Sequence, residues 1–145
     1  MFAYLDSSVL IKKYFQEDGS NHIPEIWKNS KYLAISQVGY SEILATMNRK
    51  QKIDRFNDKI KSNLIRQFKE DWSYLIRINV DSLLNIELED IHKNHHLRGF
   101  DAIHLASAKL LFKVLREDIL FLSADVNLSL AAGNEGINTG KYKWK

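Results

Sequence analysis

Residues 2–10 read Phe-Ala-Tyr-Leu-Asp-Ser-Ser-Val-Leu, a short apolar run that ends at a carboxylate and passes into a helical pattern. Phe2–Leu5 predicts a buried strand, and the apolar residues of Val9–Phe15 predict a helix directly behind it. A strand that leads straight into a helix is typical of a parallel α/β sheet. Asp6 then lies at the carboxyl end of the strand, the edge at which such sheets bind ligands.

The same alternation of strands and helices continues through the chain. Further strands are predicted at Tyr32–Ile35, Tyr74–Val80 and Ile119–Leu122, with a brief fifth near Gly136–Asn138. Further helices are predicted at His22–Asn29, Gln37–Lys50, Phe56–Trp72, Leu83–His95, Asp101–Leu115 and Val126–Ala132. The pattern predicts a single α/β domain over residues 1–145, with a short parallel sheet of four to five strands and helices on both faces.

Three more acidic residues occupy positions similar to that of Asp6. Asp125 follows a strand, Asp101 opens an Ala- and Leu-rich helix, and Glu42 lies in the helix behind the second strand. Because the carboxyl ends of parallel strands share one edge, we expect the four carboxylates to meet there. Gathered carboxylates repel one another and resist desolvation, and Mg²⁺ or Mn²⁺ relieves both effects because it prefers oxygen ligands. The sequence therefore predicts a metal site suited to phosphate esters.

The acidic residues lie in four segments, which are Asp6-Ser-Ser-Val-Leu10, Ser41-Glu-Ile43, Leu97-Arg-Gly-Phe-Asp-Ala-Ile-His-Leu-Ala106 and Leu122-Ser-Ala-Asp125. In their order and spacing they resemble the four acidic motifs of PIN-domain ribonucleases, and in particular those of the VapC-like toxins of type II toxin–antitoxin modules. The third segment is the most specific. The resemblance extends from Met1 to about Ile137.

The resemblance implies a PIN-like fold and a metal-dependent endoribonuclease that hydrolyses RNA phosphodiester bonds with Mg²⁺ or Mn²⁺. Its catalytic residues and metal ligands would be Asp6, Glu42, Asp101 and Asp125. Ser8 and Ser123 would be polar residues that support these carboxylates. The implied partners are an RNA substrate (tRNA, rRNA or mRNA), a cognate antitoxin and a second copy of the chain in a homodimer.

Each acidic residue by itself has a simpler interpretation. Asp6, Asp101 and Asp125 could each cap a turn or a helix. Glu42 could point to solvent from its helix. The apolar and small residues behind Asp101 favour a partly buried site. The metal-site prediction rests on the occurrence of all four motifs together in the expected structural context.

The basic residues near the acidic motifs leave alternatives open. Arg98 could contact an RNA phosphate with two guanidinium nitrogens, or it could pair with a nearby carboxylate and position the loop before the helix. His104, one turn after Asp101, could contact the site, but packing within this buried helix is favoured. His92, His95 and His96 share a helix face but lack a further zinc ligand at recognisable spacing, which favours a solvated helix end.

Composition limits the class of protein. The chain has 145 residues, of which 45% are hydrophobic, enough for a packed core. A formal charge of +3 permits an RNA partner without demanding one. The absence of cysteine excludes disulfides and thiolate zinc sites and fits a cytoplasmic protein. Asp6 interrupts the N-terminal apolar run and no apolar run is long, so we expect neither a signal peptide nor a membrane span.

Two segments outside the acidic motifs also carry a pattern. Apolar residues recur every four positions from Phe56 to Trp72, which indicates core or an oligomer surface. Lys141–Lys145 interleaves lysines with Tyr142 and Trp144, a composition that could bind single-stranded RNA by stacking and charge. For this segment we expect a flexible basic and aromatic tail.

Two other functions compete with the nuclease. A non-catalytic PIN-like module would bind RNA or protein without cutting, although such a module gains nothing from four clustered carboxylates. A phosphotransfer enzyme could use Asp6 as a nucleophile, as haloacid-dehalogenase-like phosphatases do. Those enzymes need a second aspartate two residues further on, where this chain has Ser8. We therefore expect a nuclease.

Overall fold

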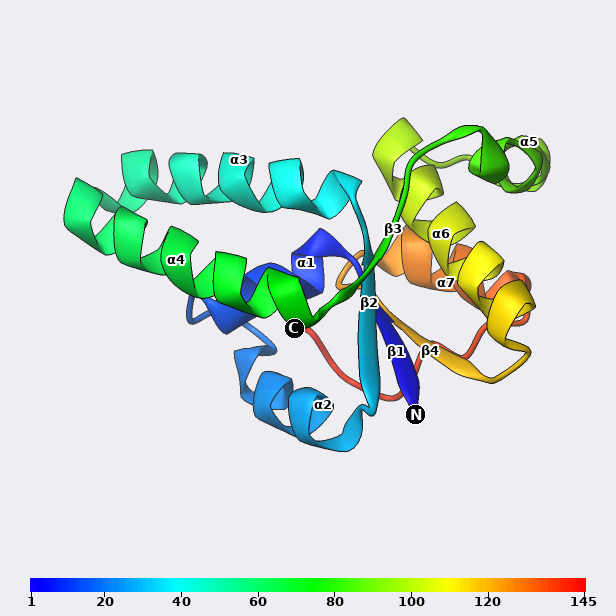
Figure 1. Cartoon of the computed structure of the whole chain (residues 1–145), viewed down its shortest axis with the longest axis horizontal. Helices are drawn as coiled ribbons and strands as arrows, with labels where there is room; N and C mark the ends of the chain where they lie inside the picture. The colour runs from blue at the N-terminus through cyan, green and yellow to red at the C-terminus, as the bar shows by residue number, and fades with distance from the viewer.

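A four-stranded parallel sheet forms the centre of the molecule (Figure 1). The structure, a computed structural model, describes residues 1–145. Its strands are β1 (Phe2–Leu5), β2 (Tyr32–Ser36), β3 (Ile76–Ile78) and β4 (Ile119–Leu122), in the order β3-β2-β1-β4. Every neighbouring pair is parallel, with β1 between β2 and β4. The carboxyl ends of all four strands therefore lie along one edge.

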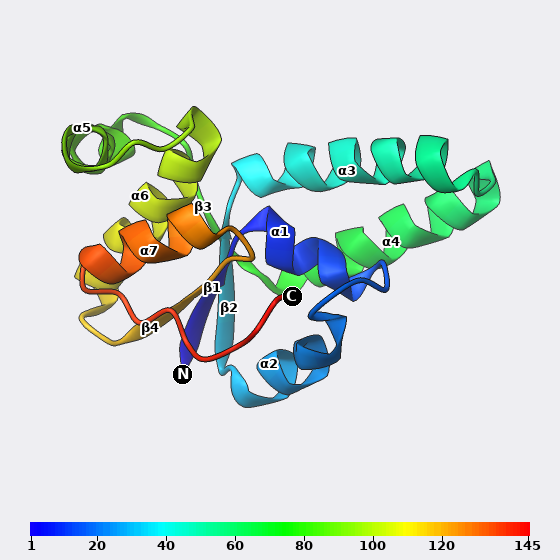
Figure 2. The ribbon, with the colours of Figure 1, turned by 180° about the vertical axis from the view of Figure 1, so that it is seen from behind.

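Seven α-helices surround the sheet. They are α1 (Ser7–Leu10), α2 (Ile23–Asn29), α3 (Val38–Asp54), α4 (Asp58–Tyr74), α5 (Asn85–Asn94), α6 (Gly99–Leu115) and α7 (Val126–Asn134). Figures 1 and 2 show α1–α4 on one face of the sheet and α5–α7 on the other. The predicted α/β architecture, with helices on both faces of a parallel sheet, is confirmed. None of the helices is both long enough and apolar enough to cross a lipid bilayer.

The core consists of two apolar clusters, one on each face of the sheet. They are separate because successive residues of a strand point to opposite faces. In β1, Ala3 and Leu5 belong to the cluster beneath α1–α4, whereas Tyr4 belongs to the cluster beneath α5–α7. The short strands are thus buried on both sides, which explains their continuous apolar sequences.

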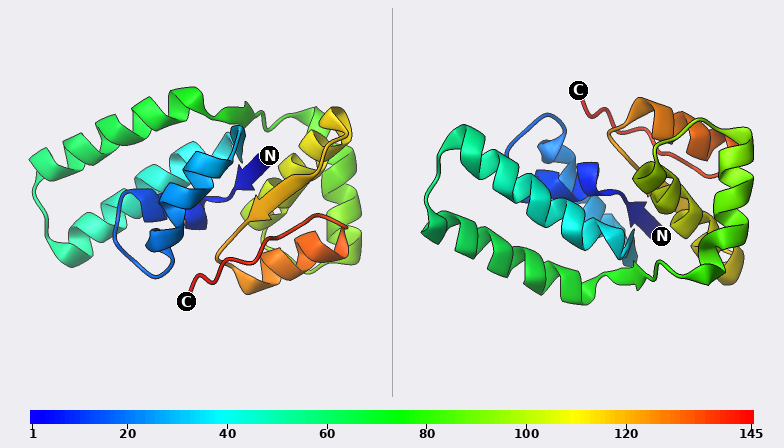
Figure 3. Two further views of the ribbon diagram at one scale, coloured as in Figure 1. Left: turned by 90° about the horizontal axis from the view of Figure 1, so that it is seen from below. Right: turned by 90° about the horizontal axis from the view of Figure 1, so that it is seen from above.

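Helices α3 and α4 form a long antiparallel pair that extends beyond the sheet (Figure 3). Arg55 reverses the chain with a left-handed backbone (φ 55°), and Asn57 then caps α4 by accepting a hydrogen bond from the Ile60 N–H at 2.9 Å. The predicted apolar stripe of α4 is buried in one half of the helix and exposed in the other. Phe68 and Trp72 are buried near the sheet, whereas Ile60 is 47% exposed near the far end. Only the half of the stripe nearer the sheet is core.

Two strands differ from the sequence-based expectation. Helix α4 continues to Tyr74, so β3 spans only Ile76–Ile78 in place of the predicted Tyr74–Val80. The alternating pattern overestimated this strand because β3 is an edge strand that pairs with β2 alone. The predicted fifth strand is a single bridge between Leu120 and Asn138, so the sheet has four strands.

The C-terminal residues pack against the core cluster beneath α1–α4. The sequence predicted a flexible tail for this segment. Tyr142 and Trp144 both contact that cluster. Trp144 also lies against Gly19 and the ring of His22. Aromatic side chains bury a large apolar area, and this burial favours an ordered position for the segment.

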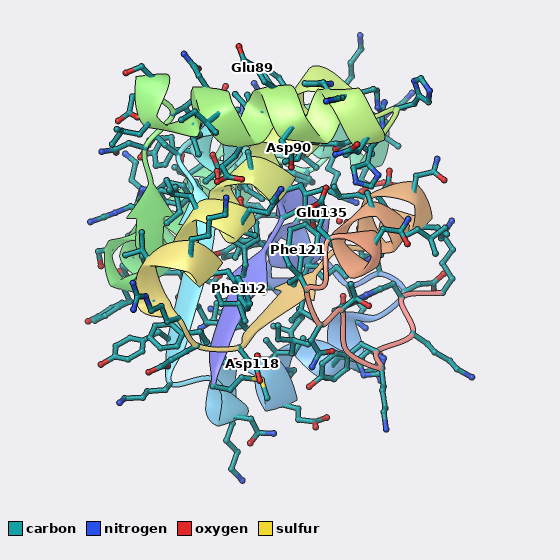
Figure 4. The ribbon with its side chains drawn as sticks, turned by 90° about the vertical axis from the view of Figure 1, so that its right-hand side faces the viewer. Glu89, Asp90, Phe112, Asp118, Phe121 and Glu135 are labelled. Atoms are coloured by element: carbon teal, nitrogen blue, oxygen red, sulfur yellow. The ribbon has the colours of Figure 1, made fainter.

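An ion network joins α5, α6 and the end of α7. The Lys109 ammonium of α6 lies 2.8 Å from Asp90 and 3.1 Å from Glu135. It also lies 3.4 Å from Glu87, which pairs with Lys113 at 2.5 Å. Figure 4 labels Asp90 and Glu135 on the side of the molecule that these three helices form. The side chains of Lys109 and Glu87 are 10% and 7% exposed, so their charges depend on one another.

We expect Lys109→Met to lower the free energy of unfolding by about 3 kcal/mol, because the change leaves the largely buried carboxylates of Glu87 and Glu135 without the cation that they share. Lys113→Met is the matched control on the same helix. The Lys113 side chain is 58% exposed, so its loss should cost less than about 1 kcal/mol. Urea unfolding followed by circular dichroism measures both variants. Equal losses would contradict the central role of Lys109.

Candidate active site

The carboxyl edge of the sheet opens into a cavity of about 920 Å³. The predicted acidic residues all line it, and these are Asp6, Glu42, Asp101 and Asp125. The structure therefore brings together all four carboxylates that the sequence singles out. They do not converge on one point, since no three acidic or histidine side chains are arranged to bind the same cation.

Asp6 is the most buried of the four carboxylates, with 4% of its surface exposed. Its side chain caps α1 by accepting a hydrogen bond from the Val9 N–H at 3.2 Å. It also accepts hydrogen bonds from the hydroxyls of Ser8 and Ser123, each at 2.5 Å. Burial raises the pKa of the Asp6 carboxyl above its ordinary value, although the charge of His104 and these hydrogen bonds oppose the rise.

Ser8 and Ser123 hold Asp6 against the turn that follows β4. The Ser8 hydroxyl accepts a hydrogen bond from the Ala124 N–H at 2.9 Å, and the Ser123 hydroxyl accepts one from the Asp125 N–H at 3.0 Å. Each hydroxyl accepts from the backbone and donates to Asp6, so its orientation is determined. The two serines therefore connect the end of β1 to the end of β4 through one carboxylate.

Glu42 reaches the cavity from the early turns of α3, and two side chains hold it there. Its Oε1 lies 2.6 Å from Nε2 of His104 and accepts a hydrogen bond from the Ser7 hydroxyl at 2.7 Å. Partial burial raises the pKa of the Glu42 carboxyl, but the hydrogen bond and charge of His104 and the Ser7 hydroxyl outweigh it. The net pKa lies below its ordinary value. Glu42 thus points into the cavity and not to solvent.

His104 is a site residue, although the sequence favoured packing within the helix over contact with the site. Its ring is buried, and Nδ1 lies 2.8 Å from the hydroxyl of Tyr4. The Tyr4 hydroxyl accepts a hydrogen bond from the Ser36 N–H at 3.0 Å. The Nε2–H of the ring can donate to Glu42 in either case, whether the Tyr4 hydroxyl donates to Nδ1 of a neutral ring or accepts from Nδ1–H of a charged one. The available signal was the three-residue spacing from Asp101, which places both side chains on one helix face.

Arg98 links the two remaining carboxylates. Its Nε lies 3.5 Å from Asp101, and a terminal nitrogen lies 4.0 Å from Asp125. Desolvation and the charge of Asp125 raise the pKa of the Asp101 carboxyl, although the charges of Arg98 and His104 oppose them. Asp125 also caps α7 by accepting a hydrogen bond from the Leu128 N–H at 2.9 Å. Arg98 pairs with carboxylates, and its 86% exposed side chain also remains accessible to a phosphate.

The three histidines at the end of α5 lie outside the cavity. His95 lies 2.9 Å from Glu135, within the ion network of the opposite face of the sheet. His95 therefore belongs to this ion network and not to the acidic site.

The donor set of the cavity fits a hard divalent cation. Its carboxylates supply oxygen ligands, which Mg²⁺ and Mn²⁺ prefer. Burial raises the pKa values of Asp6 and Asp101, and the charge of Asp125 raises that of Asp101 further; a bound cation relieves both effects. Because no three side chains converge, water would complete the coordination, as it commonly does for Mg²⁺.

The raised pKa values of Asp6 and Asp101 predict a stability cost at neutral pH. Between the ordinary and the raised pKa, the folded protein binds more protons than the unfolded chain. The free energy of unfolding therefore falls as the pH rises through that interval. We expect Asp101→Asn to remove part of this fall and to stabilise the metal-free protein at pH 7 by less than about 1 kcal/mol, because solvent screens this partly exposed carboxylate.

Urea unfolding in EDTA, from about pH 4 to pH 7, measures this effect. Glu117→Gln is the control, since Glu117 is exposed and does not line the cavity. An Asp101→Asn variant that is less stable than the native protein at pH 7 would show that Asp101 is not under electrostatic strain.

Comparison with known proteins identifies the family of the chain. The PIN domain family model matches residues 3–133, which is most of the chain. Two relatives from Mycobacterium tuberculosis, Ribonuclease VapC45 and Ribonuclease VapC49, are each 24% identical to the chain over 105 residues. The similar region covers 72% of this chain and 73% of each relative.

Three solved structures share the fold. A toxin–antitoxin complex from Klebsiella pneumoniae has a chain with a TM-score of 0.69 at 17% identity, over 97% of this chain and 99% of that one. FitAcB from Neisseria gonorrhoeae has a TM-score of 0.68 at 12% identity, over 94% of each chain. VapBC2 from Rickettsia felis, bound to a promoter DNA fragment, has a TM-score of 0.60 at 14% identity, over 87% and 89%. The family match, the sheet and the four acidic motifs agree, and the chain belongs to the PIN domain family.

Proposed function

We propose that this protein is a Mg²⁺- or Mn²⁺-dependent endoribonuclease and the toxin of a type II toxin–antitoxin module. The observation that carries the proposal is the meeting of four acidic side chains in one cavity at the carboxyl edge of a PIN-domain sheet. Relatives named as ribonucleases, and similar folds in toxin–antitoxin complexes, support it. A protein that only bound a partner would have no use for carboxylates held together at a desolvation cost.

The cavity has a basic side as well as an acidic one, which suits a polyanionic substrate. Lys12, Arg49 and Lys50 line it, from the turn after α1 and from α3. Glu17 lies 3.0 Å from the ammonium groups of both lysines, so one carboxylate positions two cations. A net positive wall remains. It could bind the phosphates of a strand whose scissile bond lies at the acidic side.

In this proposal the four carboxylates hold the cation, directly or through water. When bound, Mg²⁺ or Mn²⁺ supplies a Lewis acid that activates water and neutralises charge on the phosphate. His104 and Ser7 keep the Glu42 carboxylate in one orientation toward the cavity. Arg98, exposed beside the site, can donate to a phosphate oxygen of the substrate.

The proposed partners are a cognate antitoxin and a second copy of the chain, and the proposed location is the cytoplasm, where RNA substrates are found. The similar folds in FitAcB, VapBC2 and the Klebsiella toxin–antitoxin complex support an antitoxin partner. An antitoxin could inhibit by placing a basic side chain among the four carboxylates, where its charge would replace that of the cation. A complex with no antitoxin group near Asp6 or Asp101 would exclude this mode of inhibition.

The second candidate function is a PIN module that binds RNA or protein without cutting. The observation that favours it is the lack of three converging metal ligands in the structure. The two functions differ in one measurable respect, because only the nuclease requires the carboxylates for turnover.

We expect the purified protein, freed of antitoxin, to cut tRNA or total RNA in Mg²⁺ or Mn²⁺ and not in EDTA. Asp101→Asn should lower the rate by at least about 100-fold, as does the loss of a group that stabilises the transition state. Glu117→Gln should leave the rate unchanged. Mn²⁺ should also raise the melting temperature of the native protein more than that of Asp101→Asn, which tests metal binding without activity.

The outcomes separate the candidate functions. Stabilisation by metal without cleavage of either RNA pool would favour the binding module. Cleavage that persists in EDTA would remove the metal from the proposal.

We also expect Lys50→Gln to weaken the binding of single-stranded RNA in EDTA. Loss of one phosphate contact should make the plot of log affinity against log salt shallower by about 0.7. Lys52→Gln is the matched control, because Lys52 lies on the same helix but is exposed and does not line the cavity. Equal effects of the two changes would indicate general charge attraction and not a phosphate contact at the basic wall.

A further inference from the structure

The chain beyond the PIN-domain match runs along the outer side of the edge strand β4. The match ends at residue 133, and α7 ends at Asn134. The Asn138 carbonyl then accepts a hydrogen bond from the Phe121 N–H of β4 at 2.7 Å. Figure 2 shows the last residues, in red, running from α7 across to the side of α1 and α2. This segment therefore packs beside β4, although the family match does not include it.

A second cavity, of about 330 Å³, lies between this segment and α7. Its lining includes Tyr142, Trp144 and Lys145 from the segment and Val126 and Leu130 from α7. Ala124 and Asp125 line both this cavity and the active-site cavity. The two cavities are thus neighbours that meet at a carboxylate of the site.

The aromatic rings of the segment are held in position. Trp144 packs so closely on Gly19 that a Cβ atom there would lie 2.7 Å from its Cε3. The ring of His22 meets Trp144 edge-on, with 5.7 Å between ring centres, and its Nε2 lies 2.9 Å from the Lys143 carbonyl. The ring of Tyr142 lies 5.8 Å from that of Trp144. Tyr142 and Trp144 are only half-buried, so each retains accessible surface.

The opposite wall of the cavity is apolar and exposed. Val126 is 67% exposed and Leu130 is 62% exposed, and both lie on α7. Packing of the segment against the core does not account for these side chains, because it leaves them uncovered. A flat ligand with one charged edge would cover apolar surface on both walls and place its charge near Lys145.

Aromatic rings beside cations are a common means of binding single-stranded nucleic acid. Every base has a flat π-face, and stacking on a protein ring contributes about 1–3 kcal/mol per base. We propose that this second cavity binds a nucleobase of the RNA strand, next to the scissile phosphate, with Trp144 as the stacking platform. The inference rests on the proposed ribonuclease function and defines part of its substrate site.

The test compares two single-stranded RNAs of about 12 nucleotides and equal charge, one of adenosines and one whose riboses lack bases. Fluorescence anisotropy in EDTA measures the binding of both without cleavage. We expect the native protein to bind the adenosine strand at least about five-fold more tightly. Trp144→Ala should lose most of that preference, and Trp144→Phe should retain it.

Three further variants serve as controls. Trp27→Phe changes a tryptophan that lines neither cavity and should leave the preference unchanged. Lys145→Gln should weaken the binding of both strands alike, because it removes charge and not stacking. Tyr142→Ala provides a second test through the neighbouring ring should Trp144→Ala not fold, and it should reduce the preference for the adenosine strand.

Equal binding of the two RNAs by the native protein would overturn the proposal, and so would an unchanged preference in folded Trp144→Ala and Tyr142→Ala variants. Circular dichroism verifies the folding of each variant. The cleavage assay and this binding test can give opposite results, so each proposal can be refuted without the other. If the protein prefers base-bearing RNA but cuts none, the base site is supported and the ribonuclease function is contradicted. If the protein cuts RNA but shows no preference for base-bearing RNA, only the base site is contradicted.

Discussion

The rest of the site depends on the hydrogen bonds that the buried residue Asp6 makes. Its backbone N–H donates to the Leu122 carbonyl at 3.0 Å and so continues the pairing of β1 with β4. Its side chain caps α1 and accepts hydrogen bonds from Ser8 and Ser123. These bonds offset part of the cost of burying the charge, although the pKa of the carboxyl stays raised. Strand register and site chemistry are therefore coupled, because both use the same residue.

The other carboxylates divide the cavity into two kinds of environment. Glu42 is held through His104 and Tyr4 to the backbone of β2, so its orientation depends on the interior of the protein. Asp101 and Asp125 share the exposed guanidinium of Arg98, so this part of the cavity is open to an incoming anion. One half is preorganised by the sheet, and the other can exchange its ion pairs for those of a substrate.

Much of the fold could be predicted because the sheet is buried on both faces, which makes each strand a short apolar run with a clear boundary. The predictions were wrong for segments that are not buried on both faces of the sheet. The edge strand β3 is shorter than its alternating pattern, since only β2 pairs with it. The segment near Asn138 forms one bridge and no strand. The C-terminal segment has a charged composition, and the position of its aromatic rings depends on a surface around Gly19 that no local pattern describes.

The sequence by itself determined that four acidic residues would reach one edge of a parallel sheet. Alternating strands and helices, joined by right-handed crossovers, leave a single edge for the strand ends. Only the tertiary structure decided which partners each carboxylate has. His104 contacts Glu42 across 62 residues of sequence and Tyr4 across 100. Such contacts arise only after the order β3-β2-β1-β4 has brought distant segments side by side, and periodicity within a segment cannot encode them.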